Sequence, residues 1–233
     1  MSVTSALASA LTGLSATSRQ AEIVSSNVAN AATPGYARRE VSLGAHVLGG
    51  TGQGVQVKGV TRQIDQFLMG DRRAAQAAAG DRDARAAFLQ RMEQIFGQPE
   101  DPGSLSARVA ALDTALMEAA SRPESEARLA SAVDSARLLA LTLNRASDAV
   151  QDERARADTA IATAVGDLNS ALTQVREINT QIRSFSGAGR DVSALMDQRQ
   201  QIVDRISGLV PVREVPREHG QIALMTTGGA VLL

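Results

Sequence analysis

The sequence has no cysteine and no tryptophan, and only one tyrosine and four phenylalanines among its 233 residues. Without cysteine the chain can form no disulfide, no thiolate nucleophile and no zinc or iron–sulfur site with sulfur ligands. Its two histidines, His46 and His219, have no second ligand at the spacing that metals need. So few aromatic rings also disfavour a deep ligand pocket. We therefore expect no metal and no cofactor.

Long apolar runs and excess charge are also missing. No run of about 18 apolar residues occurs, so no segment is expected to insert into a membrane. The net charge is −1, and such a balance is not typical of a protein that binds nucleic acid. The glycine-rich stretch at 49–54 lacks the Lys-Ser/Thr of a phosphate loop. No serine has the context of a nucleophile elbow. The sequence does not predict an enzyme.

The composition that remains favours helices. Hydrophobic residues make up 44% of the chain, and alanine occurs 41 times. An interior rich in alanine and poor in rings suits helices that pack closely together. We predict a mainly α fold, an elongated bundle of long helices with a small β part.

Residues 2–32 form the first predicted helix, roughly 45 Å long. Apolar or small residues recur there at alternating spacings of four and three, the pattern of a heptad repeat. The positions are Val3, Leu7, Ala10, Leu14, Thr17, Ala21, Val24, Val28 and Ala31. Only five of the nine are Val or Leu, so this helix is expected to be marginal alone. It is either one arm of an internal bundle or a helix that awaits a partner helix.

The remaining elements follow from the breaks in the sequence. Thr33-Pro34-Gly35-Tyr36 predicts a type II turn after the first helix. An exposed β-excursion with a flexible tip is expected near 40–61, where glycines interrupt alternating valines. Helices are predicted from 64 to about 95, from Ser104 as N-cap to about 121, from 123 to about 184, and from 192 to 207.

The C-terminal region is predicted to be β-like, with strands at 210–215, 221–225 and 230–233. Its apolar end, Val231-Leu232-Leu233, is an unusual natural terminus, and we expect a truncated chain. The carboxylates Glu177, Asp197 and Asp204 lie on predicted helices with arginines nearby. For all three we expect solvated helix surface.

The end of the first helix carries a family resemblance. Residues 25–36 resemble the N-terminal signature shared by bacterial flagellar rod, hook and hook-associated proteins. The pattern is an Ala/Ser-rich helix ending in Asn-x-x-Asn, followed by Thr-Pro-Gly-Tyr. The matching residues here are Asn27, Asn30, Thr33, Pro34, Gly35 and Tyr36.

Two later segments resemble the hook-associated protein 1 family in particular. Gly52-Gln53-Gly54-Val55-Gln56-Val57, with Arg62, Asp65, Phe67 and Leu68, resembles the stretch that follows the first signature. The second signature of that family is Leu-x-Asp-Gln-Arg-Asp, and it is similar to Leu195-Met196-Asp197-Gln198-Arg199-Gln200. Gln200 stands where the family has aspartate.

The resemblance implies a domain organisation. Residues 1–32 would be half of an inner coiled-coil domain, whose C-terminal partner helix is absent from this sequence. Residues 33–63 would be a turn and β-excursion linker, 64–209 a domain of long helices, and 210–233 the start of a β region. The assembly face would consist of Val3, Leu7, Ala10, Leu14, Ala21, Val24 and Val28.

The resemblance also implies a function. Members are structural components of the extracellular flagellum at the hook–filament junction, secreted by the flagellar type III apparatus. Implied partners are other copies in a ring, the hook protein, the second junction protein, an export chaperone and the export apparatus. Two alternatives remain: a rod or hook protein of the same family, and a cytoplasmic coiled-coil scaffold.

Overall fold

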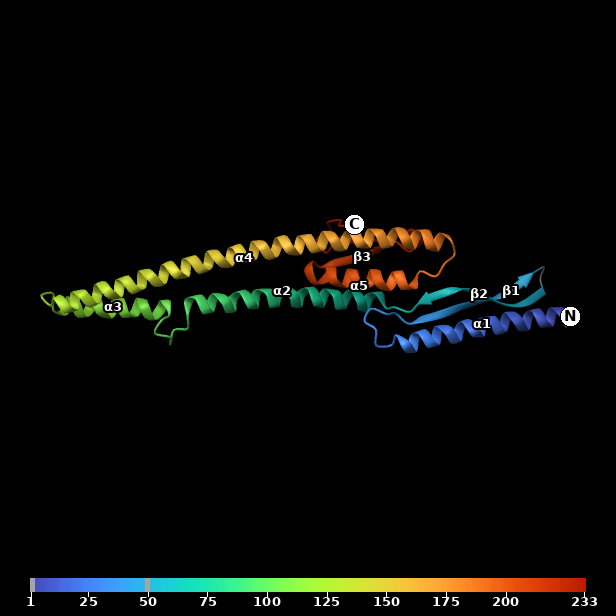
Figure 1. Ribbon diagram of the computed structural model, residues 1–233, viewed down its shortest axis with the longest axis horizontal. Helices are drawn as coiled ribbons and strands as arrows, with labels where there is room; N and C mark the ends of the chain where they lie inside the picture. The colour runs from blue at the N-terminus through green and yellow to red at the C-terminus, as the bar shows by residue number, and fades with distance from the viewer. Residues whose placement is uncertain (1–2, 49–50) are drawn as a thin grey trace. The chain divides into compact units, whose positions relative to one another are not determined.

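The computed structural model describes residues 3–48 and 51–233 (Figure 1). The helices are α1 (Val3–Ala29), α2 (Gln66–Phe96), α3 (Leu105–Ser121), α4 (Glu126–Gly187) and α5 (Ser193–Leu209), with a 3-10 turn, η1, at Glu218–Gly220. The strands are β1 (Arg39–Leu48), β2 (Thr51–Arg62), β3 (Val212–Pro216) and β4 (Ile222–Thr226). They form two antiparallel sheets, β1–β2 and β3–β4. This confirms the predicted mainly α fold with a small β part.

The chain separates into two compact units. Unit 1 comprises Met1–Ala78 and Asp167–Leu233, and unit 2 comprises Ala79–Gly166. Helices α2 and α4 each contribute residues to both units. The domain division expected from the motifs, with boundaries after residues 32, 63 and 209, stays a prediction.

In unit 1, α1 lies along the β1–β2 hairpin (Figure 1). The β-excursion is therefore covered by a helix on one side, where we had expected it to be exposed. Of the two alternatives for the first helix, the arm of an internal helix bundle is not what the described residues show, since the main contacts of α1 are with strands. The predicted flexible tip falls at residues 49–50, outside the described residues.

Glycine allows the close approach of β2 to α1. Gly54 has φ +100°, and a Cβ built there would lie 2.1 Å from Oγ1 of Thr12 and 3.0 Å from Cα of Ser9. The adjacent amide of Val55 donates to Thr12 Oγ1 at 3.2 Å. Any side chain at position 54 would thus force the strand away from the helix.

A single apolar core holds the C-terminal part of unit 1. It joins α4, α5 and the β3–β4 sheet. The buried members are Val175, Ile178, Ile182, Ile202, Val203, Ile206, Ile222 and Leu224. Fully burying each such side chain contributes roughly 1.5–3 kcal/mol, so this cluster is the main source of stability in the unit.

The predicted β-like tail is confirmed in outline. β3 and β4 pair from Val212 opposite Thr226 to Pro216 opposite Ile222. The third predicted strand is reduced to one bridge between Met225 and Val231. The amide of Leu232 donates to the carbonyl of Leu224 at 2.9 Å.

Unit 2 contains the end of α2, all of α3 and the start of α4. Ser104 caps α3 as predicted, because its side chain accepts a hydrogen bond from the amide of Ala107. A small buried cluster joins α3 to α4 and consists of Ala115, Ala119 and Ala132. Alanine contacts of this kind are what the composition predicted for closely packed helices.

An ion cluster in unit 2 surrounds the buried side chain of Glu153. Arg91 Nε and Arg156 Nη1 each lie 2.6 Å from its carboxylate oxygens. The hydrogen bond from Arg91 lowers the pKa of Glu153 below its ordinary 4.5, burial opposes that shift, and Arg156 adds to it. The charged form of this carboxylate is therefore favoured in the folded unit.

We expect this cluster to make unit 2 sensitive to acid. A carboxyl whose folded pKa is lowered stabilises the fold above its unfolded pKa, and this contribution is lost as pH falls through the folded pKa. Glu153→Gln should therefore unfold more easily than the wild type near neutral pH, and the difference should shrink below pH 4.5. Urea unfolding at pH values from neutral to below 4.5 measures this difference in the free energy of unfolding. The control is Asp83→Asn, at an exposed site. If the stability of both variants changed equally with pH, the stabilising role of the Glu153 carboxylate would be contradicted.

Candidate assembly face and signature network

The predicted assembly face of α1 is exposed along its length. Its Val and Leu side chains range in exposure from 59% at Val24 to 87% at Val3. All seven residues, namely Val3, Leu7, Ala10, Leu14, Ala21, Val24 and Val28, are exposed. Leu11, 58% exposed, widens this stripe and was missing from the predicted set. The stripe is a continuous apolar surface that no described part of the chain covers.

The opposite side of α1 is the one that packs. Ala16 and Ile23 are its buried residues. They follow Leu14 and Ala21 by two positions, which is about 200° around a helix. The hairpin therefore covers the side of α1 that faces away from the assembly face. This arrangement favours a partner helix over a place within an internal bundle.

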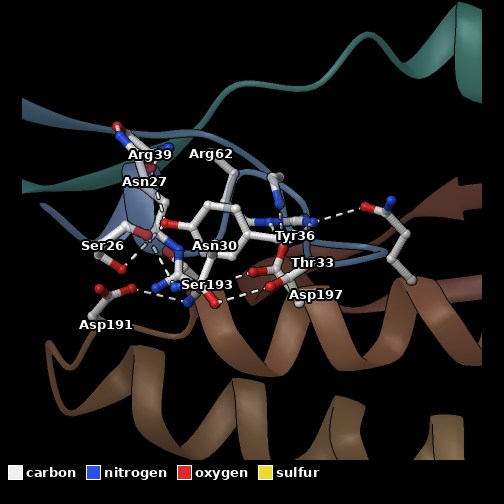
Figure 2. A network of polar contacts seen from close by, with 12 residues as sticks. Ser26, Asn27, Asn30, Thr33, Tyr36, Arg39, Arg62, Asp191, Ser193 and Asp197 are labelled. Carbon is white, nitrogen blue, oxygen red and sulfur yellow. Dashed lines mark hydrogen bonds and ion pairs between the residues drawn. The ribbon is translucent and has the colours of Figure 1, made fainter. Parts of the chain in front are cut away.

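The first signature works as a polar network at the end of α1 (Figure 2). Oδ1 of Asn27 accepts from the hydroxyl of Tyr36 at 2.9 Å and from the amide of Arg39 at 3.0 Å. Its Nδ2 donates to the carbonyl of Arg39 at 2.9 Å. The guanidinium of Arg39 also lies over the Tyr36 ring, 4.8 Å from its centroid. One asparagine thus fixes where β1 starts relative to α1.

The turn between them has the predicted type II form. Gly35 has φ +79°, and the amide of Tyr36 donates to the carbonyl of Thr33 at 3.2 Å. Asn30 closes the helix end by donating to the carbonyl of Ser26 at 2.9 Å. Helix α1 therefore ends at Ala29, three residues before the predicted end.

The turn also touches Gln201, the residue that follows the second signature on α5. Nε2 of Gln201 donates to the carbonyl of Pro34 at 2.7 Å. A Cβ at Gly35 would lie 2.5 Å from Cγ of Gln201. Glycine is therefore required here both by its positive φ and by the side chain that lies against it.

Asp197 links the second signature to Arg39, which in turn bonds Asn27 of the first signature. Its carboxylate accepts from Arg39 Nη2 at 2.7 Å, from Arg62 Nε at 2.8 Å and from the amide of Ala37 at 3.3 Å. The residue is only 7% exposed. Our expectation of solvated helix surface is thus wrong for Asp197. It holds for Glu177, which is exposed, whereas Asp204 is half-buried in ion pairs of its own.

Arg199 points to the other side of α5. Its Nη1 donates to Oδ1 of Asn179 at 2.7 Å and to the carbonyl of Gly220 at 2.8 Å. Burial lowers the pKa of the Arg199 guanidinium to about 10, while Glu214 raises it and Arg62 lowers it. The signature thus separates its charges, with Asp197 facing the hairpin and Arg199 bonding to α4 and to the 3-10 turn η1.

The other two polar positions of the second signature differ from each other. Gln198 is exposed. Gln200, the departure from the family pattern, accepts from Arg62 Nη2 at 2.8 Å. A neutral amide therefore occupies a place beside an arginine where the family pattern has a carboxylate.

Sequence patterns alone missed two central residues. Arg39 contacts both signatures, yet in the sequence it is one of two arginines after a turn. Asn179 bonds the backbone of Ile222 in both directions, at 2.8 and 3.3 Å, besides accepting from Arg199. Asn179 could have been recognised in the sequence from its place on the apolar stripe of α4, because a buried amide needs hydrogen-bond partners.

The bonds of the network hold segments of the chain in position relative to one another. Its charged side chains are paired, and its hydroxyl and amide groups bond to one another. Within residues 3–48 and 51–233 no three His, Asp or Glu side chains gather as metal ligands. None of the helices in the described part of the chain has the length and apolar character needed to cross a bilayer.

Two families match the chain. The family described as flagellar hook-associated protein FlgK helical domain matches residues 89–233. The family described as flagella basal body rod protein matches residues 7–36. The first match includes the second signature and most of the helical region, and the second includes the first signature.

Curated relatives match nearly all of the chain. Flagellar hook-associated protein 1 of Bacillus subtilis is 30% identical over 237 residues, covering 97% of this chain and 46% of the relative. The protein of the same name from Salmonella typhimurium is 27% identical and covers 96% and 41%. The chain thus spans less than half the length of these relatives.

A solved structure shares the fold. The flagellar hook junction protein FlgK from Burkholderia pseudomallei matches with a TM-score of 0.63 and 22% identity, over 70% of this chain and 28% of that chain. The FlgK helical domain alone matches more than half of the chain. The open stripe on α1, the paired signatures and these matches together lead to one conclusion: the chain belongs to the flagellar hook-associated protein FlgK family.

Proposed function

We propose that this chain is part of a structural protein of the bacterial flagellum that connects hook to filament. The protein acts by association and is not an enzyme. It leaves the cell through the flagellar export apparatus, aided by an export chaperone, and assembles into a ring between the hook protein and the second junction protein. The names of the relatives, flagellar hook-associated protein 1 and flagellar hook junction protein, support a place at the hook.

The observation that carries the proposal is the uncovered apolar stripe on α1. Stripe residues such as Leu14 are exposed, while the opposite side of the helix lies on the hairpin. Burying apolar surface contributes about 25 cal/mol per Å², reduced by the entropy of ordering the partners. A helix from elsewhere in the full protein or from a neighbouring subunit covers the stripe during assembly.

Deletion of the gene in its own bacterium tests this proposal. A missing connector should leave hooks without filaments and release filament protein into the medium. Electron microscopy of the cells and immunogold labelling of a tagged, restored protein provide the readout. We expect the label at the distal end of the hook.

The same experiment separates the alternatives. Loss of the hooks themselves would point to a rod or hook protein. Complete filaments on the deletion strain, with the tagged protein retained inside the cell, would point to a cytoplasmic scaffold. Either result would overturn the proposal.

A further inference from the structure

Helix α5 has two different long faces. One face carries Ile202, Val203 and Ile206 into the apolar core of unit 1. Another carries Asp197 and Asp204, seven residues apart and therefore on the same side of the helix. The first face packs into the apolar core, whereas the acidic face forms ion pairs with arginines.

Two separate pairs of arginines bind the acidic face, and each pair with its aspartate is called a clamp. Asp197 pairs with Arg39 and Arg62, which lie at the ends of β1 and β2 and oppose each other in the hairpin. Asp204 pairs with Arg72 and Arg73 of α2. Arg73 also reaches Oε1 of Glu214 on β3 at 2.7 Å.

The α1–hairpin module, residues 3–62, has no share in the apolar core of unit 1. Every buried or partly buried hydrophobic residue of that cluster comes from positions 168–233. Within the described residues, the hydrogen bonds and ion pairs between the module and α5 end on Asp197, Gln200 and Gln201. The attachment therefore uses polar and charged groups and shares no residue with the apolar core.

The clamp around Asp197 also has a surplus of positive charge. Arg39 and Arg62 share the one carboxylate of Asp197, and Gln200 offers Arg62 only a neutral oxygen. Buried Arg199 is also close enough for the positive charge of Arg62 to lower its pKa. Within the described residues, Asp197 is therefore the only anion in the bonds between the module and α5.

A short segment lies between the two clamps. Ile64 and Asp65 belong to no helix or strand. Asp65 caps α2 by accepting from the amides of Phe67 and Leu68 at 2.9 and 3.0 Å. The clamp at Asp204 holds α2, so this segment is the place where the module can turn.

We propose that the Asp197 clamp is an electrostatic joint from which the α1–hairpin module detaches and pivots at residues 64–65 while the apolar core stays folded. Opening the joint exposes polar groups to water and uncovers no side chain of the apolar core. Salt weakens such a contact, because mobile ions screen attraction between charges, whereas apolar burial is not weakened in this way. The inference concerns the chain by itself and does not depend on the proposed junction function.

Distance measurements between paired spin labels test the joint. The chain has no cysteine, so label sites can be introduced singly at exposed positions. Gln20→Cys on α1 with Ala194→Cys on α5 reports the joint. Thr180→Cys on α4 with Ala194→Cys reports the core. Pulsed electron paramagnetic resonance gives both distance distributions for the chain of 233 residues.

We expect a narrow distribution for the joint pair at low salt. It should broaden between about 10 mM and about 1 M salt, as the Debye length falls from roughly 30 to 3 Å. Asp197→Asn should lose the narrow peak already at low salt. The core pair should stay narrow throughout, which shows that the variant is folded.

Two further variants test the chemistry in opposite directions. Gln200→Glu adds an anion beside Arg62 and should keep the joint pair narrow at higher salt than the wild type. Asp204→Asn cuts only the clamp on α2 and should leave the joint pair narrow at low salt. Asp81→Asn, which removes an exposed carboxylate paired with Arg85, is the charge-matched control.

Three results would overturn the inference. The first is a joint-pair distribution that is already broad in the wild type at low salt. The second is a joint-pair distribution that neither salt nor Asp197→Asn alters. The third is broadening of the core pair together with the joint pair, which would mean that the module leaves only when the core unfolds.

Discussion

Leu14→Asp is expected to abolish incorporation of the protein into the flagellum while leaving the monomer folded. Leu14 is 68% exposed and lies in the middle of the assembly face. In the monomer an aspartate there stays in water. In the assembled state it would be buried without a partner, at a cost of several kcal/mol.

The matched control is Ser15→Asp. Ser15 is exposed and lies to the side of the assembly face, seven residues before Glu22, which already places a carboxylate on that side. Immunogold labelling and motility of cells that express each variant give the comparison. Circular dichroism of the purified chains checks that both are folded. Normal incorporation of Leu14→Asp would refute the assignment of the assembly face.

Asn179→Ala is expected to lower the free energy of unfolding of unit 1 by about 3 kcal/mol, since it leaves several buried polar groups unsatisfied. The side chain of Asn179 bonds both backbone groups of Ile222 and accepts from Arg199. Loss of the amide leaves the buried Arg199 guanidinium with only the carbonyl of Gly220.

Urea unfolding measures this effect, with Asn144→Ala as the control at an exposed site of the same helix. Hydrogen exchange in β4 should rise together with the loss of stability, since Ile222 lies in that strand. Equal unfolding midpoints for the two variants would show that the Asn179 bonds contribute nothing measurable.

Features set by local chemistry were predictable from the sequence. The absence of proline between residues 123 and 211 allowed the long helix, and the structure has α4 from Glu126 to Gly187. Ser104 was recognised as an N-cap from its position, and Pro34-Gly35 as a type II turn. In each case a few neighbouring residues determine the backbone.

Features set by distant pairing were not predictable. Asp197 bonds Arg39 and Arg62 across 158 and 135 residues of sequence. From the sequence alone, the carboxylate of Asp197, which has polar neighbours on a helix, cannot be distinguished from a solvent-exposed one. The position of α1 against strands was missed for the same reason, because a heptad repeat describes only one side of a helix. The use of that side in assembly stays a prediction.

The β1–β2 hairpin supports α1 on one side and so lowers the entropic cost of binding a partner on its exposed side. An isolated helix with so thin a stripe would have to order as it bound, and the lost chain entropy would weaken the complex. With one side already supported by β1 and β2, α1 presents a preformed surface to an incoming partner. Preorganisation lowers the entropic cost of association, so even a stripe of valine, leucine and alanine can hold a partner that a disordered segment could not.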